Sequence, residues 1–212
     1  MRDARKAGLA PAERRHRRQY KPGEERREEI LAATLEILAE EGLHAWTTRA
    51  LASRIGVSEA TIFRHFESKE EILTEAVRQQ IRAMRQRAET YEGTGDAWER
   101  ASGLVLHILD FVESTGGAPL IVLTGQAVRI QPSLRQEAMK TIGTIRGKLT
   151  ALFAEAVAKA RPRREVDPSV LADLAIAVGQ STGLRWLISG RRHPLKRRAA
   201  EMLRALRHSV GE

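Results

Sequence analysis

The sequence contains no cysteine, which excludes a disulfide framework, a thiolate nucleophile and a cysteine metal site. It also lacks any apolar run as long as the eighteen or so residues that a membrane span requires. Its basic opening segment has no apolar central region of the kind found in signal peptides. We therefore expect a cytoplasmic protein with no membrane partner, since a chain without disulfides suits a reducing compartment.

The sequence also lacks a recognisable catalytic constellation. It has no HExxH pair and no glycine-rich phosphate loop, and its six histidines are scattered. Neither paired carboxylates nor a nucleophile beside a base can be identified. We therefore expect no enzyme, no metal and no cofactor, and an enzyme built on a helical bundle is the weaker alternative.

The net charge of +9 is concentrated at the two ends of the chain. Residues 1–21 carry eight basic groups against two acidic ones, and residues 191–212 carry seven against two, which leaves the middle slightly negative. Basic ends on a nearly neutral body suggest a polyanionic partner, although solvated tails that aid solubility remain an equal alternative.

Apolar residues recur at helical spacing over most of the chain, and no stretch alternates like a strand. Few large apolar groups occur before residue 23, which predicts a disordered basic arm there. A helix is expected from Glu24 to about Gly42. The later helices are expected over residues 68–91, 96–114, 119–130, 132–159, 168–189 and 194–209, four of them beginning at Pro119, Pro132, Pro168 and Pro194. The predicted fold is all-α.

The stretch TTRALASRIGVSEATIFRHFESKEE, at residues 47–71, predicts two short helices joined by a tight turn. Thr47 or Thr48 can cap the first helix, and Gly56 can end it in a left-handed conformation. Ser58 can then cap the second helix. This arrangement is a helix-turn-helix, whose second helix can enter the major groove of DNA.

The chemistry around this turn favours an interaction with DNA. Helix N-termini offer unpaired amides and a positive dipole end to phosphate. Arg49, Arg64 and Lys69 add positive charge, and only Glu59 opposes them between positions 47 and 66. The sequence from Ser68 to Glu71 has the form of a capping box, in which the serine accepts from an amide and the glutamate reaches back.

Residues 24–75 resemble the N-terminal domain of the TetR family of bacterial transcriptional regulators. The specific part is the pattern TTRxLAxxIGVSxxTIFRHFxSKEE, whereas beyond residue 90 the likeness is one of architecture only. The resemblance implies a DNA-binding surface made of Thr47, Thr48, Arg49, Ser58, Glu59, Ala60, Thr61, Phe63, Arg64, His65 and Lys69.

Some of these positions leave alternatives open. Phe63 stands where such proteins often have tyrosine, so a hydroxyl contact to phosphate is lost or replaced by an apolar contact with a thymine methyl or a sugar. Arg64 could be a solvated charge rather than a base or phosphate contact. His65 could be structural, and Lys69 could be a charge of the capping turn alone.

The resemblance also implies how the chain is divided. A disordered basic arm over residues 1–23 would precede a helix-turn-helix domain over residues 24–70, and residues 71–212 would form a larger C-terminal regulatory and dimerisation domain. In the family the last two helices pair with those of a second copy, and residues 168–209 occupy that place. The sequence does not say which of their apolar faces is core and which is interface.

Polar residues interrupt several apolar helices of the C-terminal half, and a buried polar group without a partner costs about 1–3 kcal/mol. Either a neighbouring helix or a bound molecule satisfies them. The candidate ligand-binding residues are His107, Asp110, Phe111, Thr124, Gln126, Gln180 and Trp186. Gly179 and Gly183 weaken the same predicted helix as Gln180, which indicates the close approach of another helix.

These observations together favour a homodimeric transcriptional regulator that binds double-stranded DNA at a palindromic operator. A repressor released by an unknown small-molecule effector is the form that the resemblance implies. A DNA-binding adaptor that responds to a protein partner is the alternative.

Overall fold

The computed structural model of the chain describes residues 23–123, 132–160 and 165–210. Within these ranges all regular structure is helical, which confirms the predicted all-α fold. The basic arm predicted over residues 1–23 lies outside the described residues, except for Gly23, which begins the first helix. The helices are α1 (Gly23–Glu40), α2 (Thr48–Ile55), α3 (Glu59–Phe63), α4 (Lys69–Thr90), α5 (Ala97–Ser114), α6 (Ala118–Leu123), α8 (Pro132–Ala160), α9 (Pro168–Ile188) and α10 (Leu195–Ser209).

Helix boundaries agree closely with the predicted ones because local capping sets them. Asp96 caps α5 through a reciprocal capping box with Glu99, and Asp167 caps α9 directly before Pro168. Pro194 instead stands one position before α10. The helix predicted over residues 119–130 is described only as α6, since residues 124–131 lie outside the described ranges.

A first hydrophobic core holds α1, α2 and α3 against the beginning of α4. Its most deeply buried members include Ile30, Ile37, Leu51 and Ile62. The side of α2 is also held by ion pairs, because Arg54 contacts the carboxylates of Glu36, Glu40 and Glu41 at the end of α1. We call this unit, residues 23–68 with the first turns of α4, the head.

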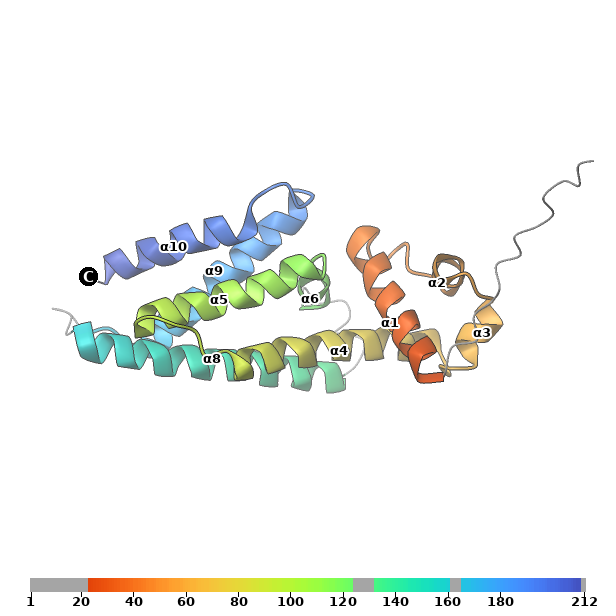
Figure 1. Cartoon of the computed structure of the whole chain (residues 1–212), viewed down its shortest axis with the longest axis horizontal. Helices are drawn as coiled ribbons and strands as arrows, with labels where there is room; N and C mark the ends of the chain where they lie inside the picture. Colours follow the sequence, from red (N-terminus) through yellow and green to blue (C-terminus); the bar gives the residue numbers. More distant parts are fainter. Residues whose placement is uncertain (1–22, 124–131, 161–164, 211–212) are drawn as a thin grey trace, which may run out of the picture.

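A second hydrophobic core lies between the remaining helices, which form an elongated bundle beside the head (Figure 1). Phe153 of α8 is fully buried there and meets Trp98 of α5 edge to face, with 4.9 Å between the ring centroids. Lys148 of α8 donates to the carbonyls of Ala88 and Glu89 and so caps the end of α4. None of the helices in the described ranges is long and apolar enough to cross a membrane.

The closeness expected around the α9 glycines is confirmed at Gly183. A Cβ atom on Gly183 would lie 2.6 Å from a methyl group of Leu120 in α6, nearer than real Cβ contacts come. A Cβ on Gly179 would lie 3.5 Å from Val105 of α5, which is ordinary contact. Glycine at residue 183 therefore lets α6 approach α9, and this gain offsets the helix stability that glycine costs.

The head and the bundle meet at several places. The first is α4, which runs from one to the other alongside α8, whose Leu134 and Ala138 also pack into the core of the head (Figure 1). The second is the end of α1, where Ala39 lies against the turn after α5. A Cβ on Gly116 would lie 3.1 Å from the Ala39 Cβ, and Arg191 donates to the Ala39 carbonyl from the loop between α9 and α10.

Candidate nucleic-acid interface and ligand cavity

The turn between α2 and α3 forms as the sequence predicts, through hydrogen bonds between near neighbours. Thr47 is the residue that caps α2, and its hydroxyl accepts from the Ala50 amide at 3.0 Å. Gly56 adopts the left-handed conformation with φ 69°, and the Val57 amide donates back to the Ala52 carbonyl. Ser58 then accepts from the Thr61 amide at 3.3 Å. The three residues of this turn therefore orient α3 relative to α2.

Helix α3 has a buried side and an outward side. Ile62 is fully buried, and Phe66, just after the helix, is 2% exposed. Ser58, Ala60, Phe63 and Arg64 are exposed, and they form the outward edge of α3. Phe63 is 46% exposed, so an apolar ring is accessible at this edge.

Glu59 and Thr61 lie beside this edge with partners within the head. The Thr48 hydroxyl donates to Glu59 at 2.6 Å, and the Arg49 guanidinium lies 3.9 Å from the other carboxylate oxygen. The Thr61 hydroxyl lies 2.9 Å from that of Ser58. Glu59 therefore joins α3 to the start of α2. Since the Arg49 side chain is 89% exposed, its own ion pair is weak, and its charge stays accessible.

His65 lies at the end of α3 among cationic neighbours. Partial burial, followed by the positive charges of Arg64, Arg26 and Arg27, lowers the pKa of His65 below its ordinary value of 6.5. The protonated form of the ring is therefore disfavoured. Arg27 of α1 donates to the His65 carbonyl and lies 4.0 Å from the Phe66 ring centroid.

Arg26 and Arg27 were not identified from the sequence as part of this region. Both lie in the run EERREE, where four acidic neighbours outnumber the two arginines and make the segment acidic overall. Only the packing of α1 across the end of α3 brings them to His65. A basic pair at a helix start is a weak signal without that contact.

Lys69 begins α4 beside the start of α2. Ser68 caps α4 by accepting from the Glu71 amide at 3.0 Å, as expected. Glu71 instead reaches the Glu67 amide at 2.6 Å, one residue earlier than the capping box predicts. The Lys69 ammonium is exposed and lies 5.8 Å from the Trp46 ring centroid, so it stands near two helix N-termini.

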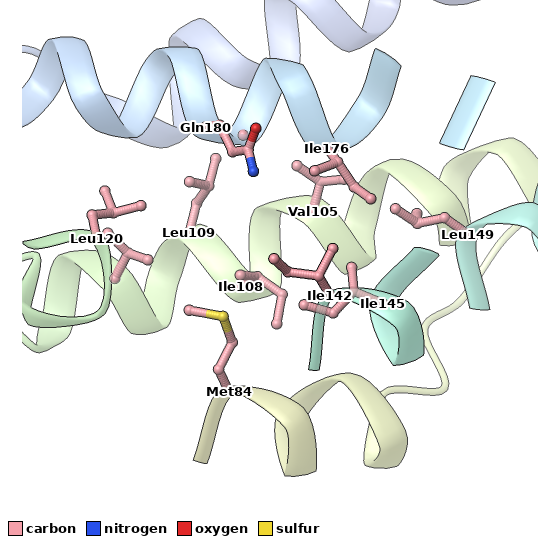
Figure 2. Close-up of a pocket in the computed structure, with 12 residues that line it drawn as sticks. Met84, Val105, Ile108, Leu109, Leu120, Ile142, Ile145, Leu149, Ile176 and Gln180 are labelled. Atoms are coloured by element: carbon pink, nitrogen blue, oxygen red, sulfur yellow. The ribbon is translucent and has the colours of Figure 1, made fainter. Parts of the chain in front are cut away.

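A cavity of ≈ 80 Å³ opens between α4, α5, α6, α8 and α9 (Figure 2). Its wall is aliphatic apart from Met84 of α4 and Gln180 of α9. The described lining residues are Met84, Val105, Ile108, Leu109, Val112, Leu120, Ile142, Ile145, Leu149, Ile176, Gly179 and Gln180. Of the seven residues predicted to bind a ligand, Gln180 lies on this wall.

Three of the other candidates lie on the part of α5 that faces elsewhere. The His107 ring stacks near Tyr91, with 5.4 Å between centroids, and Arg87 lies over the buried ring of Phe111. Asp110 was expected to be buried, and this is wrong. It is exposed and accepts from Lys196 of α10, and that hydrogen bond lowers the pKa of its carboxyl.

The remaining candidates lie apart from the cavity or outside the described residues. Trp186 is buried between α9 and the start of α10, where it lines a separate, open hollow with Arg185, His193 and Arg197. Thr124 and Gln126 lie outside the described residues. The five candidates within the described residues therefore do not form one cluster.

Comparison with known proteins identifies relatives of the whole chain and of the head. Residues 30–76 match the family described as bacterial regulatory proteins, tetR family. The chain is 32% identical over 163 residues to nucleoid occlusion factor SlmA of Aliivibrio fischeri, which covers 74% of this chain and 81% of that protein. SlmA of Vibrio cholerae is 31% identical over 163 residues, which again cover 74% of this chain and 81% of that protein.

Solved structures of low identity share the fold. The TetR family transcriptional regulator PfmR from Thermus thermophilus has a TM-score of 0.67 at 23% identity, over 85% of this chain and 96% of that one. FadR from Bacillus subtilis was solved in complex with stearoyl-CoA. It has a TM-score of 0.63 at 19% identity, over 87% of this chain and 97% of that one. These likenesses extend over both the head and the bundle.

The surroundings of His65 predict the direction in which its pKa is shifted. We expect the His65 ring to titrate below the ordinary pKa of 6.5 when followed by NMR, with His65→Gln used to assign its resonance. Arg64→Ala should move that pKa back toward the ordinary value, because it removes one of the neighbouring positive charges. A His65 pKa above 6.5, or one that does not respond to Arg64→Ala, would contradict this description.

Proposed function

Because the chain belongs to the TetR family of bacterial regulatory proteins, we propose that it is a ligand-responsive repressor that binds a palindromic operator as a homodimer. Membership makes it a DNA-binding transcriptional regulator. The single observation that carries the finer proposal is the outward edge of α3, held clear of the head core beside exposed Arg49 and Lys69. The protein would act in the cytoplasm, where its DNA lies.

The proposed contacts to DNA fall into two groups, those to phosphates and those to bases. The exposed cations Arg49 and Lys69, with the N-termini of α2 and α4, would bind phosphates and supply the salt-sensitive affinity. Neutral His65 would contribute a hydrogen bond and no charge. The base-reading side chains would be Ser58, Ala60, Thr61, Phe63 and Arg64, with Thr47, Thr48 and Glu59 holding the edge in position.

Phe63 and Glu59 give this edge its particular character. Phe63 would make apolar contact with a thymine methyl or a sugar, since it has no hydroxyl for a phosphate. Glu59 would serve as a brace, because its carboxylate is already engaged by Thr48. Arg64 is available to bind guanine, and half-exposed Phe63 can contact thymine. Together they favour an operator half-site that contains both guanine and thymine.

An exposed apolar stripe on α9 supports the dimer. Residues at spacings of four and three along α9 are all exposed, and four of them are large and apolar, with Ile188 78% exposed. We define the α9 stripe as Val170, Leu174, Ala177, Ser181, Leu184 and Ile188. Leu171 and Val178, on the other side, are buried in the chain's own core. A second copy would cover the stripe and place its α3 one major groove away, about 34–36 Å along the duplex.

Release from DNA would depend on α4. Met84 of α4 lines the cavity, and Lys69 at the other end of the same helix belongs to the proposed DNA surface. A molecule that binds more tightly when α4 is displaced would favour a separation of the two heads that does not match the operator. The effect requires unequal affinity for the two arrangements.

The relatives favour a second candidate function. SlmA is named as a nucleoid occlusion factor, and it is 32% identical over most of this chain. That name is compatible with the alternative of a DNA-binding adaptor that responds to a protein partner rather than to a metabolite. DNA binding that is insensitive to small molecules but altered by a protein would favour this candidate over the repressor.

The proposed function can be tested by selecting duplexes from a random pool with the purified full chain. We expect enrichment of a palindrome with two half-sites related by two-fold symmetry. Arg64→Ala should relax the preference at one base position in each half-site, because an arginine that binds guanine is removed. If no duplex is enriched over the starting pool, the proposal fails.

Lys69→Ala separates a phosphate contact from a base contact. On the selected duplex and on unrelated duplexes alike, affinity should fall, and the slope of log affinity against log salt should decrease by roughly 1. Fluorescence anisotropy at several salt concentrations measures both. Lys159→Ala, at the end of α8 farthest from the head, is the matched control and should leave the slope unchanged. An equal slope for wild type and Lys69→Ala would remove Lys69 from the DNA surface.

Leu184→Glu tests the α9 stripe. A carboxylate in the middle of an apolar interface lacks a partner, so we expect the dimer to dissociate at concentrations at least about tenfold higher than for the wild type. Sedimentation equilibrium measures this dissociation. Met139→Glu changes another large apolar side chain, 62% exposed on α8, and should leave the dimer intact. A dimer that withstands Leu184→Glu but not Met139→Glu would place the interface on α8 instead.

A further inference from the structure

The residues that line the cavity indicate which kind of molecule can bind there. Among the described residues no charged side chain lines it, and Gln180 is its only polar side chain. Two nearby charged groups that could have served a ligand are engaged elsewhere, since Asp110 pairs with Lys196 and Arg146 pairs with Asp173. An ionised group moved into such an aliphatic space would lose its hydration, and none of the described lining residues carries a charge to replace it.

The polar group stands at one edge of the cavity. Gln180 is exposed, whereas the aliphatic lining residues are buried or half-buried. Figure 2 shows its side chain extending from α9 toward Val105 and Leu109, with the aliphatic wall beyond it. An amide can donate one hydrogen bond and accept another without carrying charge. The arrangement therefore suits a molecule with an apolar body and one uncharged polar end.

The size of the cavity restricts the shape of the body. A cavity of about 150 Å³ lined by leucine, isoleucine and phenylalanine stays dry and admits benzene. The cavity here measures ≈ 80 Å³ and is open on one side, so it encloses only a few methylene groups, and a linear alkyl chain can enter it end-on where a wider ring cannot. A longer or wider group would have to move the helices apart, and Met84 brings α4 into that movement.

We propose that the effector class is a linear aliphatic molecule with an uncharged hydrogen-bonding end, such as an alcohol, a ketone or an amide. Its chain lies among Ile108, Ile142 and Ile176, and its polar end meets the amide of Gln180. This inference rests on the proposed function for the regulatory consequence, but the binding itself does not depend on DNA.

The test compares three probes that share one alkyl chain and differ at the end: 1-hexanol, hexanoate and hexyltrimethylammonium. Binding to the full-length wild type is measured by calorimetry at pH 8. We expect saturable binding of hexanol and binding of the two ions that is weaker by at least about tenfold, because a charged end held against Gln180 would lose part of its hydration and meet no charged group among the described lining residues. Equal or tighter binding of either ion, or no saturable binding of hexanol, overturns the proposal.

Two variants locate the binding. Gly179→Val fills the cavity from α9, where a Cβ fits at 3.5 Å from Val105. The substitution should lower the affinity for hexanol by about tenfold. Gly147→Val makes the same change in α8 at an exposed position with open space around it, and should bind hexanol like the wild type. If Gly179→Val proves unstable by circular dichroism, the smaller Gly179→Ala replaces it. Unchanged hexanol affinity in a folded Gly179 variant overturns the assignment.

Gln180→Leu tests the polar end separately. The ratio of hexanol affinity to 1-chlorohexane affinity should fall by roughly two- to tenfold, the range expected for one hydrogen bond. An unchanged ratio removes Gln180 from the recognition. These results are independent of the duplex selection. If a palindrome is selected and hexanol does not bind, only the effector class is lost, whereas the reverse outcome leaves an alkyl-binding protein that is not a sequence-specific regulator.

Discussion

Helix α4 is packed into both hydrophobic cores at once, and the relation between the head and the bundle depends on this shared helix. Its first half contributes Ile72 and Val77 to the core of the head, and its second half contributes Met84 and Ala88 to the core of the bundle. Because close-packed interiors resist deformation, a displacement of one half is transmitted to the other. The same helix carries Lys69 at the proposed DNA surface and Met84 at the cavity wall. One rigid element therefore connects both proposed sites.

The end of α1 forms a second contact between the head and the bundle, here with the loop between α9 and α10. Arg191 reaches the end of α1 from the loop between these helices, and Gly116 allows the turn after α5 to lie against Ala39. Three ion pairs from Arg54 hold α2 to the same end of α1. A change at the α9 stripe can thus reach α2 through a short series of contacts. Exposed ion pairs of this kind contribute little stability individually, so their effect here is mainly on orientation.

The proposed DNA surface could be predicted well where it depends on neighbours in the sequence. The caps at Ser58 and Ser68 and the left-handed Gly56 involve partners within four residues, and the structure contains all three. The engagement of Glu59 by Thr48 involves a partner eleven residues away, and the lowered pKa of His65 depends on burial and, besides its neighbour Arg64, on Arg26 and Arg27 of α1. Neither could be read from spacing. The DNA contacts themselves and the division of the chain at residue 70 stay predictions.

The sequence by itself determined the helices, their caps and the turn before α3, because interactions within one or two turns of backbone decide these features. Only the tertiary structure decided which side of each bundle helix faces inward. Helix α9 is apolar over most of its circumference, so its periodicity favours no face, and the polar residues chosen from α5 and α9 did not cluster. The packing of α6 on Gly183 and the pairing of Asp110 with Lys196 resolved that ambiguity. Those contacts join segments far apart in the chain, and their geometry exists only once the bundle is assembled.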